Sequence, residues 1–154
     1  MPHWLIYHPP GTFETESAKE ALAKDIVPIY TDGGLPAFYV VVQFIKVPVS
    51  DTYVGGEQRA ATPFVRITIA HVAINMTVDL PNDMDRQYRK LTNRIDRILK
   101  PHITAKGFDL EYTVQETERR LWKINGLVPP PWRSEEEKLW VRENRPVAYP
   151  GSVL

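Results

Sequence analysis

The chain of 154 residues contains no cysteine, which excludes disulfides, thiolate chemistry and metal sites built on cysteine. It also lacks an excess of charge of either sign. Because 19 basic residues balance 19 acidic ones, electrostatics give no reason to expect a nucleic acid or a membrane as partner. Its apolar runs are too short to cross a bilayer, and no basic-then-apolar leader opens it, so we expect a cytoplasmic protein.

Several signatures of common catalytic sites are missing as well. The sequence has no Gly-x-Gly-x-x-Gly, no Walker phosphate loop and no His-Glu-x-x-His. None of its serines lies in a Gly-x-Ser-x-Gly elbow, which argues against a serine hydrolase. The histidines have no recognisable ligand spacing, so we expect no metal site and assign them to local hydrogen bonds. They are His3, His8, His71 and His102.

What the sequence does contain is the order strand, helix, strand over residues 1–46. HWLIYH (3–8) is short, aromatic and β-branched, and predicts a buried strand. Residues 14–30 carry apolar side chains at steps of three and four, which predicts a helix capped by Thr15 or Ser17. FYVVVQFI (38–45) is almost continuously apolar, which is typical of a strand in the middle of a sheet. This order predicts a βαβ unit.

The same order returns over residues 64–116. FVRITIAHV (64–72) predicts a strand, residues 84–99 predict an amphipathic helix, and FDLEYTVQ (108–115) predicts a strand with strict alternation. The two halves also share the order of a proline, a glycine turn, an aromatic residue and a closing Val-Gln, although the distance from Pro28 to Gln43 is one residue longer than that from Pro101 to Gln115. An internal repeat of two βαβ units is therefore favoured.

Two further segments complete the chain. Residues 47–63 contain Gly55-Gly56 and predict a small hairpin. Residues 117–154 form a tail with a proline run and a short predicted helix over 134–145, capped by Ser134. The tail also holds three tryptophans, which indicates that it packs on this subunit or on a neighbouring one. We predict one α/β domain, with a four-stranded sheet, two helices, a hairpin and a tail helix.

The residue before the first predicted strand, Pro2, admits two interpretations. Proline has no backbone N–H, yet it is tolerated at the first residue of a strand. If Met1 is removed, however, Pro2 becomes a free secondary amine. Desolvation lowers the pKa of such an amine, and an amine that is neutral near pH 7 is a competent general base. The residues alone leave both interpretations open.

Nearly the whole chain resembles the tautomerase superfamily, and most of all its cis-3-chloroacrylic acid dehalogenase branch and the tautomerase-like proteins of filamentous fungi. The resemblance rests on Pro2, on the two βαβ units with a Gly-Gly hairpin between them, and on IYHPPGTF, GLPAFYV, YVGGE, LWKINGLVPPP and EEKLWVRENRPV. It implies a homotrimer with cofactor-free chemistry that turns on the amino-terminal proline.

The resemblance also marks further positions, several of which depart from the branch. Tyr30 stands where the branch has a histidine, and Tyr112 matches its tyrosine in the last core strand. Lys123 replaces a glutamate that activates water. The paired arginines that hold a substrate carboxylate are missing from IAHVAIN. Arg66, earlier in that strand, could substitute for them, or could be a surface arginine of the sheet.

These departures favour tautomerisation over hydrolytic dehalogenation, because proton transfer needs only a base and a donor to the enolate oxygen. The first hypothesis is a tautomerase that acts on a small-molecule enol or carboxylate, with Pro2 as base. In it, Tyr112, Tyr30 and Arg66 orient the substrate, and Lys123 pairs with its carboxylate. The alternatives are a cis-3-haloacrylate-type dehalogenase or hydratase, and a non-catalytic trimeric binding protein of the same fold.

Overall fold

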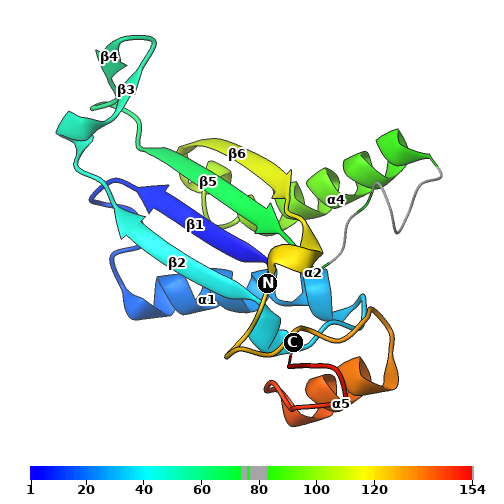
Figure 1. Ribbon diagram of the computed structural model, residues 1–154. Coiled ribbons are helices and arrows are strands. Elements are labelled where there is room, and N and C mark those ends of the chain that lie inside the picture. The colour runs from blue at the N-terminus through cyan, green and yellow to red at the C-terminus, as the bar shows by residue number, and fades with distance from the viewer. Residues whose placement is uncertain (74–75, 77–82, 154) are drawn as a thin grey trace.

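A computed structural model describes residues 1–73, 76 and 83–153, and its core is a mixed four-stranded sheet (Figure 1). The strand order is β2-β1-β5-β6, where β1 pairs parallel with β2, β5 pairs parallel with β6, and β1 and β5 pair antiparallel. The strands are β1 (His3–His8), β2 (Val41–Lys46), β5 (Phe64–His71) and β6 (Asp109–Glu116). The predicted α/β fold with two βαβ units is confirmed.

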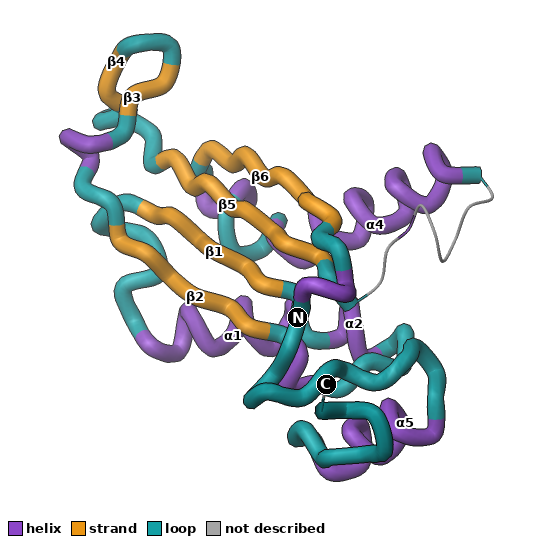
Figure 2. The backbone as a smooth tube through the Cα atoms, viewed as in Figure 1, coloured by secondary structure: helices purple, strands orange, loops and turns teal. Residues whose placement is uncertain are grey.

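Two helices cover one face of this sheet, α1 (Glu16–Ile26) and α4 (Met84–Leu99), and Figures 1 and 2 show both on the same side. Strand side chains alternate between the two faces. Trp4, Ile6, Ile67 and Ile69 point toward the helices and are wholly buried. The predicted span 84–99 of the second helix is confirmed at both ends.

The first predicted helix is divided in the structure. The side chain of Thr15 caps α1 by accepting a hydrogen bond from the N–H of Ala18 at 3.2 Å. The chain then continues as the separate turn α2 (Pro28–Thr31). Pro28 has no N–H to donate to the preceding turn, so the helix cannot continue through it without a break. As a result, Tyr30 lies on the short turn α2 and not on α1.

The prediction that residues 38–45 lie in the middle of the sheet is wrong, because β2 is an edge strand. The two first strands of the units, β1 and β5, occupy the middle. Residues 37–39 form the 3-10 turn η1 (Ala37–Tyr39), and Phe38 and Tyr39 pack against Trp140 of the tail. An apolar run has the same appearance in both settings, and long-range pairing decides which one it takes.

The hairpin and the tail helix form as predicted. β3 (Tyr53–Val54) and β4 (Glu57–Gln58) pair antiparallel across Gly55 and Gly56, which both have positive φ angles, as a tight primed turn requires. The remaining elements are the 3-10 turns η2 (Val49–Asp51), η3 (Thr104–Lys106) and η4 (Arg119–Leu121) and the helix α5 (Glu135–Glu143).

The tail packs on its own subunit. Trp140 on α5 is wholly buried in the hydrophobic core, and Trp122 packs edge-on against Tyr39 with ring centroids 5.0 Å apart. The Arg119 guanidinium donates hydrogen bonds to the carbonyls of Ala73 and Pro130. These contacts attach the tail to the end of β5.

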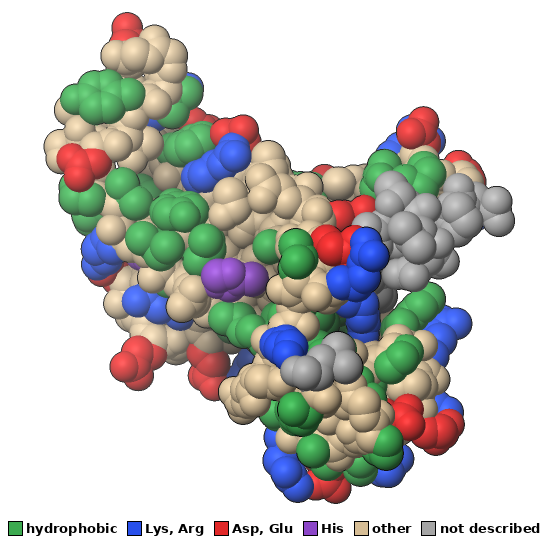
Figure 3. Space-filling model, viewed as in Figure 1, with side chains coloured by type: hydrophobic (Ala, Val, Ile, Leu, Met, Phe, Trp, Pro, Cys, Tyr) green, Lys and Arg blue, Asp and Glu red, His purple; other side chains and the backbone are tan. Residues whose placement is uncertain are grey.

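The face of the sheet opposite the helices carries no helix in the described part of the chain. Leu5 and Tyr7 on β1 are only half-buried there, and Ile45 on the edge strand β2 is 36% exposed. Figure 3 shows hydrophobic side chains gathered over the β2 side of the molecule. Within the described ranges, no helix is long and apolar enough to span a bilayer.

Candidate functional site

The antiparallel pairing of β1 and β5 brings Pro2 and His71 together. The register places Trp4 opposite Ile69 and His3 opposite Ala70, so the next pair in the same register is Pro2 and His71. Directly opposed residues of an antiparallel pair point to the same face. Trp4 and Ile69 face the helices, and Pro2 and His71 are likewise buried on that side.

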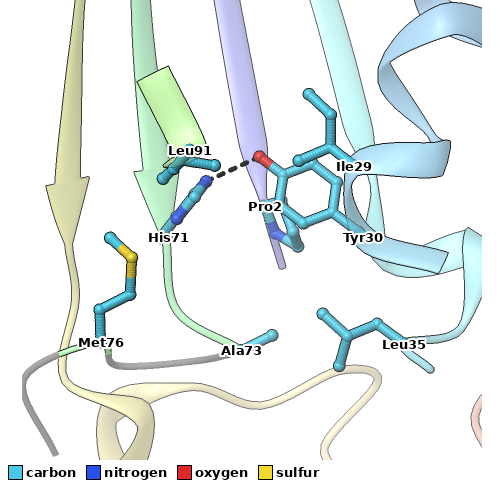
Figure 4. A pocket seen from close by; sticks show the side chains of 8 residues that line it. All are labelled: Pro2, Ile29, Tyr30, Leu35, His71, Ala73, Met76 and Leu91. Carbon is cyan, nitrogen blue, oxygen red and sulfur yellow. Dashed lines mark hydrogen bonds between the residues drawn. The ribbon is translucent and has the colours of Figure 1, made fainter. Parts of the chain in front are cut away.

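Tyr30 joins this pair from the turn α2. Its hydroxyl oxygen accepts a hydrogen bond from the indole Nε1–H of Trp4 at 2.8 Å and lies 2.7 Å from Nε2 of His71. The rings of Tyr30 and His71 meet edge-on, with centroids 5.3 Å apart. In Figure 4 the two side chains point toward one another, with Pro2 close by.

These groups line a cavity of about 130 Å³. Among the described residues, the side chains around it other than Tyr30 and His71 are apolar, and none carries a charge. An engineered cavity of roughly 150 Å³ with apolar walls holds a benzene molecule, so this cavity has room for a small organic group. The described residues that line it are Pro2, Ile29, Tyr30, Leu35, His71, Ala73, Met76 and Leu91.

Burial dominates the electrostatics of the site. Burial, followed by the positive charge of the amino terminus, lowers the pKa of His71 from 6.5 to about 4. Burial also raises the pKa of Tyr30 above its usual value. The hydrogen bond from Trp4 lowers this pKa, but by less than burial raises it. Near pH 7, therefore, the site holds a neutral imidazole and a protonated phenol.

The amino terminus lies at the same end of β1 as Pro2. Met1 is present, so the Pro2 nitrogen is part of an amide in this structure. Burial, followed by the charge of Arg119, lowers the pKa of the Met1 amine from 8.0 to about 4. The Met1 amine is therefore neutral near pH 7.

Tyr112 lies apart from Pro2 within one subunit. It pairs with Ile67 in the middle of β5, and its hydroxyl donates to Asp96 Oδ1 at 2.8 Å and to the Thr92 carbonyl at 3.3 Å. It lines a second cavity, of about 470 Å³, beside the first. Met76 and Leu91 separate the two cavities, because both residues line each of them.

Arg66 and Lys123 do not line the cavity at Pro2 either. Arg66 pairs with Glu111 on the helix-free face of the sheet. It stands five positions before His71 on β5, a distance of about 16 Å along a strand. Lys123 is exposed in the tail beyond η4. Of the residues expected from the sequence, the cavity therefore brings together Pro2 and Tyr30.

The site also depends on two residues that the sequence did not single out: His71, which lines the cavity, and Trp4, which does not line it but donates to the Tyr30 oxygen. His71 was assigned to local hydrogen bonds, and Trp4 was part of a buried strand. The end of a predicted strand is a common place for a functional side chain, and His71 ends β5. The position of His71 at a strand end becomes informative only when β5 is known to run antiparallel beside β1, because this pairing brings His71 next to Pro2. In the described parts of the chain, no three His, Asp or Glu side chains lie close enough to hold a metal ion.

We expect acid to destabilise the protein through His71. The folded state holds its pKa at about 4, against 6.5 for a free histidine, so the unfolded chain binds more protons between these values. The stability that His71 contributes is therefore complete above pH 6.5 and is lost as the pH drops toward 4, by about 3 kcal/mol in total. Urea unfolding at a series of pH values measures this loss.

The matched control is His71→Gln, which keeps a polar side chain and removes the titration. Its free energy of unfolding should vary less with pH over the same range. Parallel pH profiles for the two proteins would show that His71 is not the group responsible.

Comparison with known proteins gives a consistent result over the whole chain. A family model described as "Putative oxalocrotonate tautomerase enzyme" matches residues 1–145. A probable enzyme from the thermophilic fungus Aspergillus fumigatus is 50% identical, with 97% of this chain and 98% of that chain aligned and a TM-score of 0.84. RhCC from Rhodococcus jostii RHA1 is 40% identical, with 96% and 100% aligned and a TM-score of 0.87.

A more distant structure shares the fold alone. N1, a member of the cis-3-chloroacrylic acid dehalogenase family, is 18% identical, with 93% of this chain and 98% of that chain aligned and a TM-score of 0.61. No curated protein matches the sequence.

Proposed function

Because the chain belongs to the tautomerase superfamily, we propose that it is a cofactor-independent tautomerase in which Pro2, freed by loss of Met1, is the general base. The observation that carries the proposal is the cavity that joins Pro2 to the Tyr30 hydroxyl. A base and a hydrogen-bond donor on one apolar cavity are the parts that proton transfer next to a carbonyl requires.

The reaction follows from these two groups. The neutral Pro2 nitrogen takes the proton from the carbon next to the carbonyl, and the electrons of that C–H bond form the C=C bond. The carbonyl oxygen becomes an enolate, which the Tyr30 hydroxyl stabilises with a hydrogen bond. The Pro2 ammonium then gives its proton to the oxygen and completes the enol. Ketonisation of an enol runs through the same steps in reverse.

The lining favours this reaction over dehalogenation or hydration. Those reactions need an activated water and cations to hold a carboxylate, and none of the described residues that line the cavity is charged. Arg66 and Lys123 lie elsewhere in the subunit. The proposal therefore assigns the cavity to the reacting carbonyl and its apolar substituent, and gives neither residue a role in holding a carboxylate at this site.

The test uses protein whose loss of Met1 has been verified by intact mass. It should ketonise the enol of an aryl pyruvate, and a 3-halopropiolate should form one adduct, located at Pro2 by mass spectrometry. If the fully processed protein turns over no enol substrate and takes no adduct at Pro2, a binding protein of the same fold becomes the better account.

We also propose a homotrimer, because the uncovered sheet face and the apolar edge strand β2 are liabilities in a monomer. Sedimentation at micromolar concentration should show a trimer, and Ile45→Glu should weaken it by placing a charge on the edge strand. Val141→Glu is the control, since Val141 is also exposed but lies on α5, away from the sheet. A folded monomer at that concentration would contradict the proposal.

A further inference from the structure

We propose that Trp4 and His71 together turn the hydroxyl proton of Tyr30 into the cavity, where it binds an oxygen of the substrate. In this arrangement the indole and the imidazole both donate to the Tyr30 oxygen, and His71 is neutral with its proton on Nε2. His71 and Trp4 are then positioning residues that act through Tyr30. The inference rests on the tautomerase function proposed above, and it adds the groups that orient the donor.

Trp4 fixes one half of the arrangement. Its indole N–H can only donate a hydrogen bond, and it lies 2.8 Å from the Tyr30 oxygen. The Trp4 side chain is wholly buried, so its N–H has no water as an alternative partner. One of the two lone pairs of the Tyr30 oxygen is therefore occupied.

The contact between Tyr30 and His71 admits two directions at its distance of 2.7 Å. If Nδ1 carries the imidazole proton, Tyr30 donates to Nε2, and its own proton points away from a ligand. If Nε2 carries it, His71 donates to Tyr30 instead. Both lone pairs of the Tyr30 oxygen are then filled, and its proton is the one part of the hydroxyl left for another partner.

The remaining lining favours the second direction when a substrate oxygen is present. The other described side chains around the cavity are apolar, so among them a carbonyl or enolate oxygen that enters finds its donor in Tyr30. Leaving that oxygen unpaired in an apolar site would be costly. Two N–H groups that donate to the phenol oxygen also polarise its O–H, which makes the hydroxyl a stronger donor.

The arrangement moves no proton to or from His71. The proton that Pro2 takes from the substrate is the proton that Pro2 returns. The bond from Tyr30 strengthens as negative charge develops on the oxygen, so the contribution of His71 belongs to the transition state. Loss of this contribution should lower kcat and leave KM nearly unchanged.

Two substitutions at one position separate this role from a merely structural one. His71→Leu removes the donor, and we expect kcat for enol ketonisation to fall about tenfold at constant KM. His71→Gln keeps a side-chain N–H at a similar reach and should recover most of the rate. Equal kcat values in the two variants, or a change confined to KM, would overturn the proposal.

A second measurement needs no turnover. The protein, labelled with 15N-histidine, is titrated with 4-nitrophenol, whose ionised oxygen resembles an enolate. We expect the bound probe to be ionised, seen by its absorption, and His71, assigned by comparison with His71→Gln, to carry its proton on Nε2. Tyr30→Phe should lose the ionised probe.

The outcomes of this titration are distinct. A complex with the imidazole proton on Nδ1, or no binding of the probe at millimolar concentration, overturns the role of His71. A protein that binds the ionised probe as expected but turns over no enol overturns the proposed function and leaves the hydrogen-bond arrangement standing.

Discussion

A chain that keeps Met1 is expected to ketonise an enol at least about 100-fold more slowly than the processed chain, because a general acid–base group contributes roughly 10²–10⁴-fold. With Met1 attached, the Pro2 nitrogen is an amide whose lone pair is delocalised into the carbonyl, so it is not a base. Removal of Met1 frees the same nitrogen as a secondary amine at the edge of the cavity. Stopped-flow measurement of enol decay compares the two forms.

The two forms can be made from one preparation. Protein produced while methionine aminopeptidase is inhibited should retain Met1, and treatment of that sample with the purified aminopeptidase should restore the rate as intact mass shows the loss of Met1. Equal rates before and after complete removal would exclude Pro2 as the base. The comparison changes no residue other than Met1, which packs against the core, and circular dichroism of the two forms detects any effect of its loss on folding.

Trp140→Ala is expected to lower the free energy of unfolding by about 3–5 kcal/mol, as for other large aromatic residues removed from a core. Trp140 is wholly buried and packs against Phe38, Tyr39 and Tyr149, with ring centroids 5.9, 6.1 and 6.4 Å away. Its indole N–H also donates to the Val147 carbonyl at 2.7 Å. The substitution would leave a cavity between α5 and η1 and an unpaired carbonyl. Urea unfolding followed by fluorescence and by circular dichroism measures the loss.

Val141→Ala on the same helix is the matched control. Val141 is 41% exposed, so its truncation should change stability by no more than about 0.5 kcal/mol. If Trp140→Ala costs as little as the control, the tail does not contribute to the folded core. Two separate transitions in the Trp140→Ala protein would instead show that the tail unfolds on its own.

The sequence by itself determined the order of the main helices and strands, but not the division of the first helix into α1 and α2. Local patterns are sufficient for this order, because burial of one face imposes a period of two on a strand and of about 3.6 on a helix. The helix α4 follows its predicted span of 84–99, and Ser134 caps α5 by accepting from the N–H of Glu137. The pair Gly55-Gly56 likewise identifies the hairpin, because a tight turn there needs positive φ angles.

These local patterns did not predict which distant segments pair with one another. The apolar run of β2 fits a central or an edge strand equally well, and only the strand order β2-β1-β5-β6 decides. The same holds for Tyr112, whose alternating strand gives no sign that its hydroxyl binds Asp96 on α4.

The candidate site shows the division most clearly. Pro2 and Tyr30 could be proposed from the sequence, because one is an amino-terminal proline and the other stands at a position that the family resemblance marks. His71 could not, since it is 69 positions from Pro2 and becomes its neighbour only through the antiparallel register of β1 and β5. Register is fixed by the simultaneous burial of Trp4, Ile6, Ile67 and Ile69, which is a property of the whole core. The tertiary structure therefore decided which polar groups share the cavity.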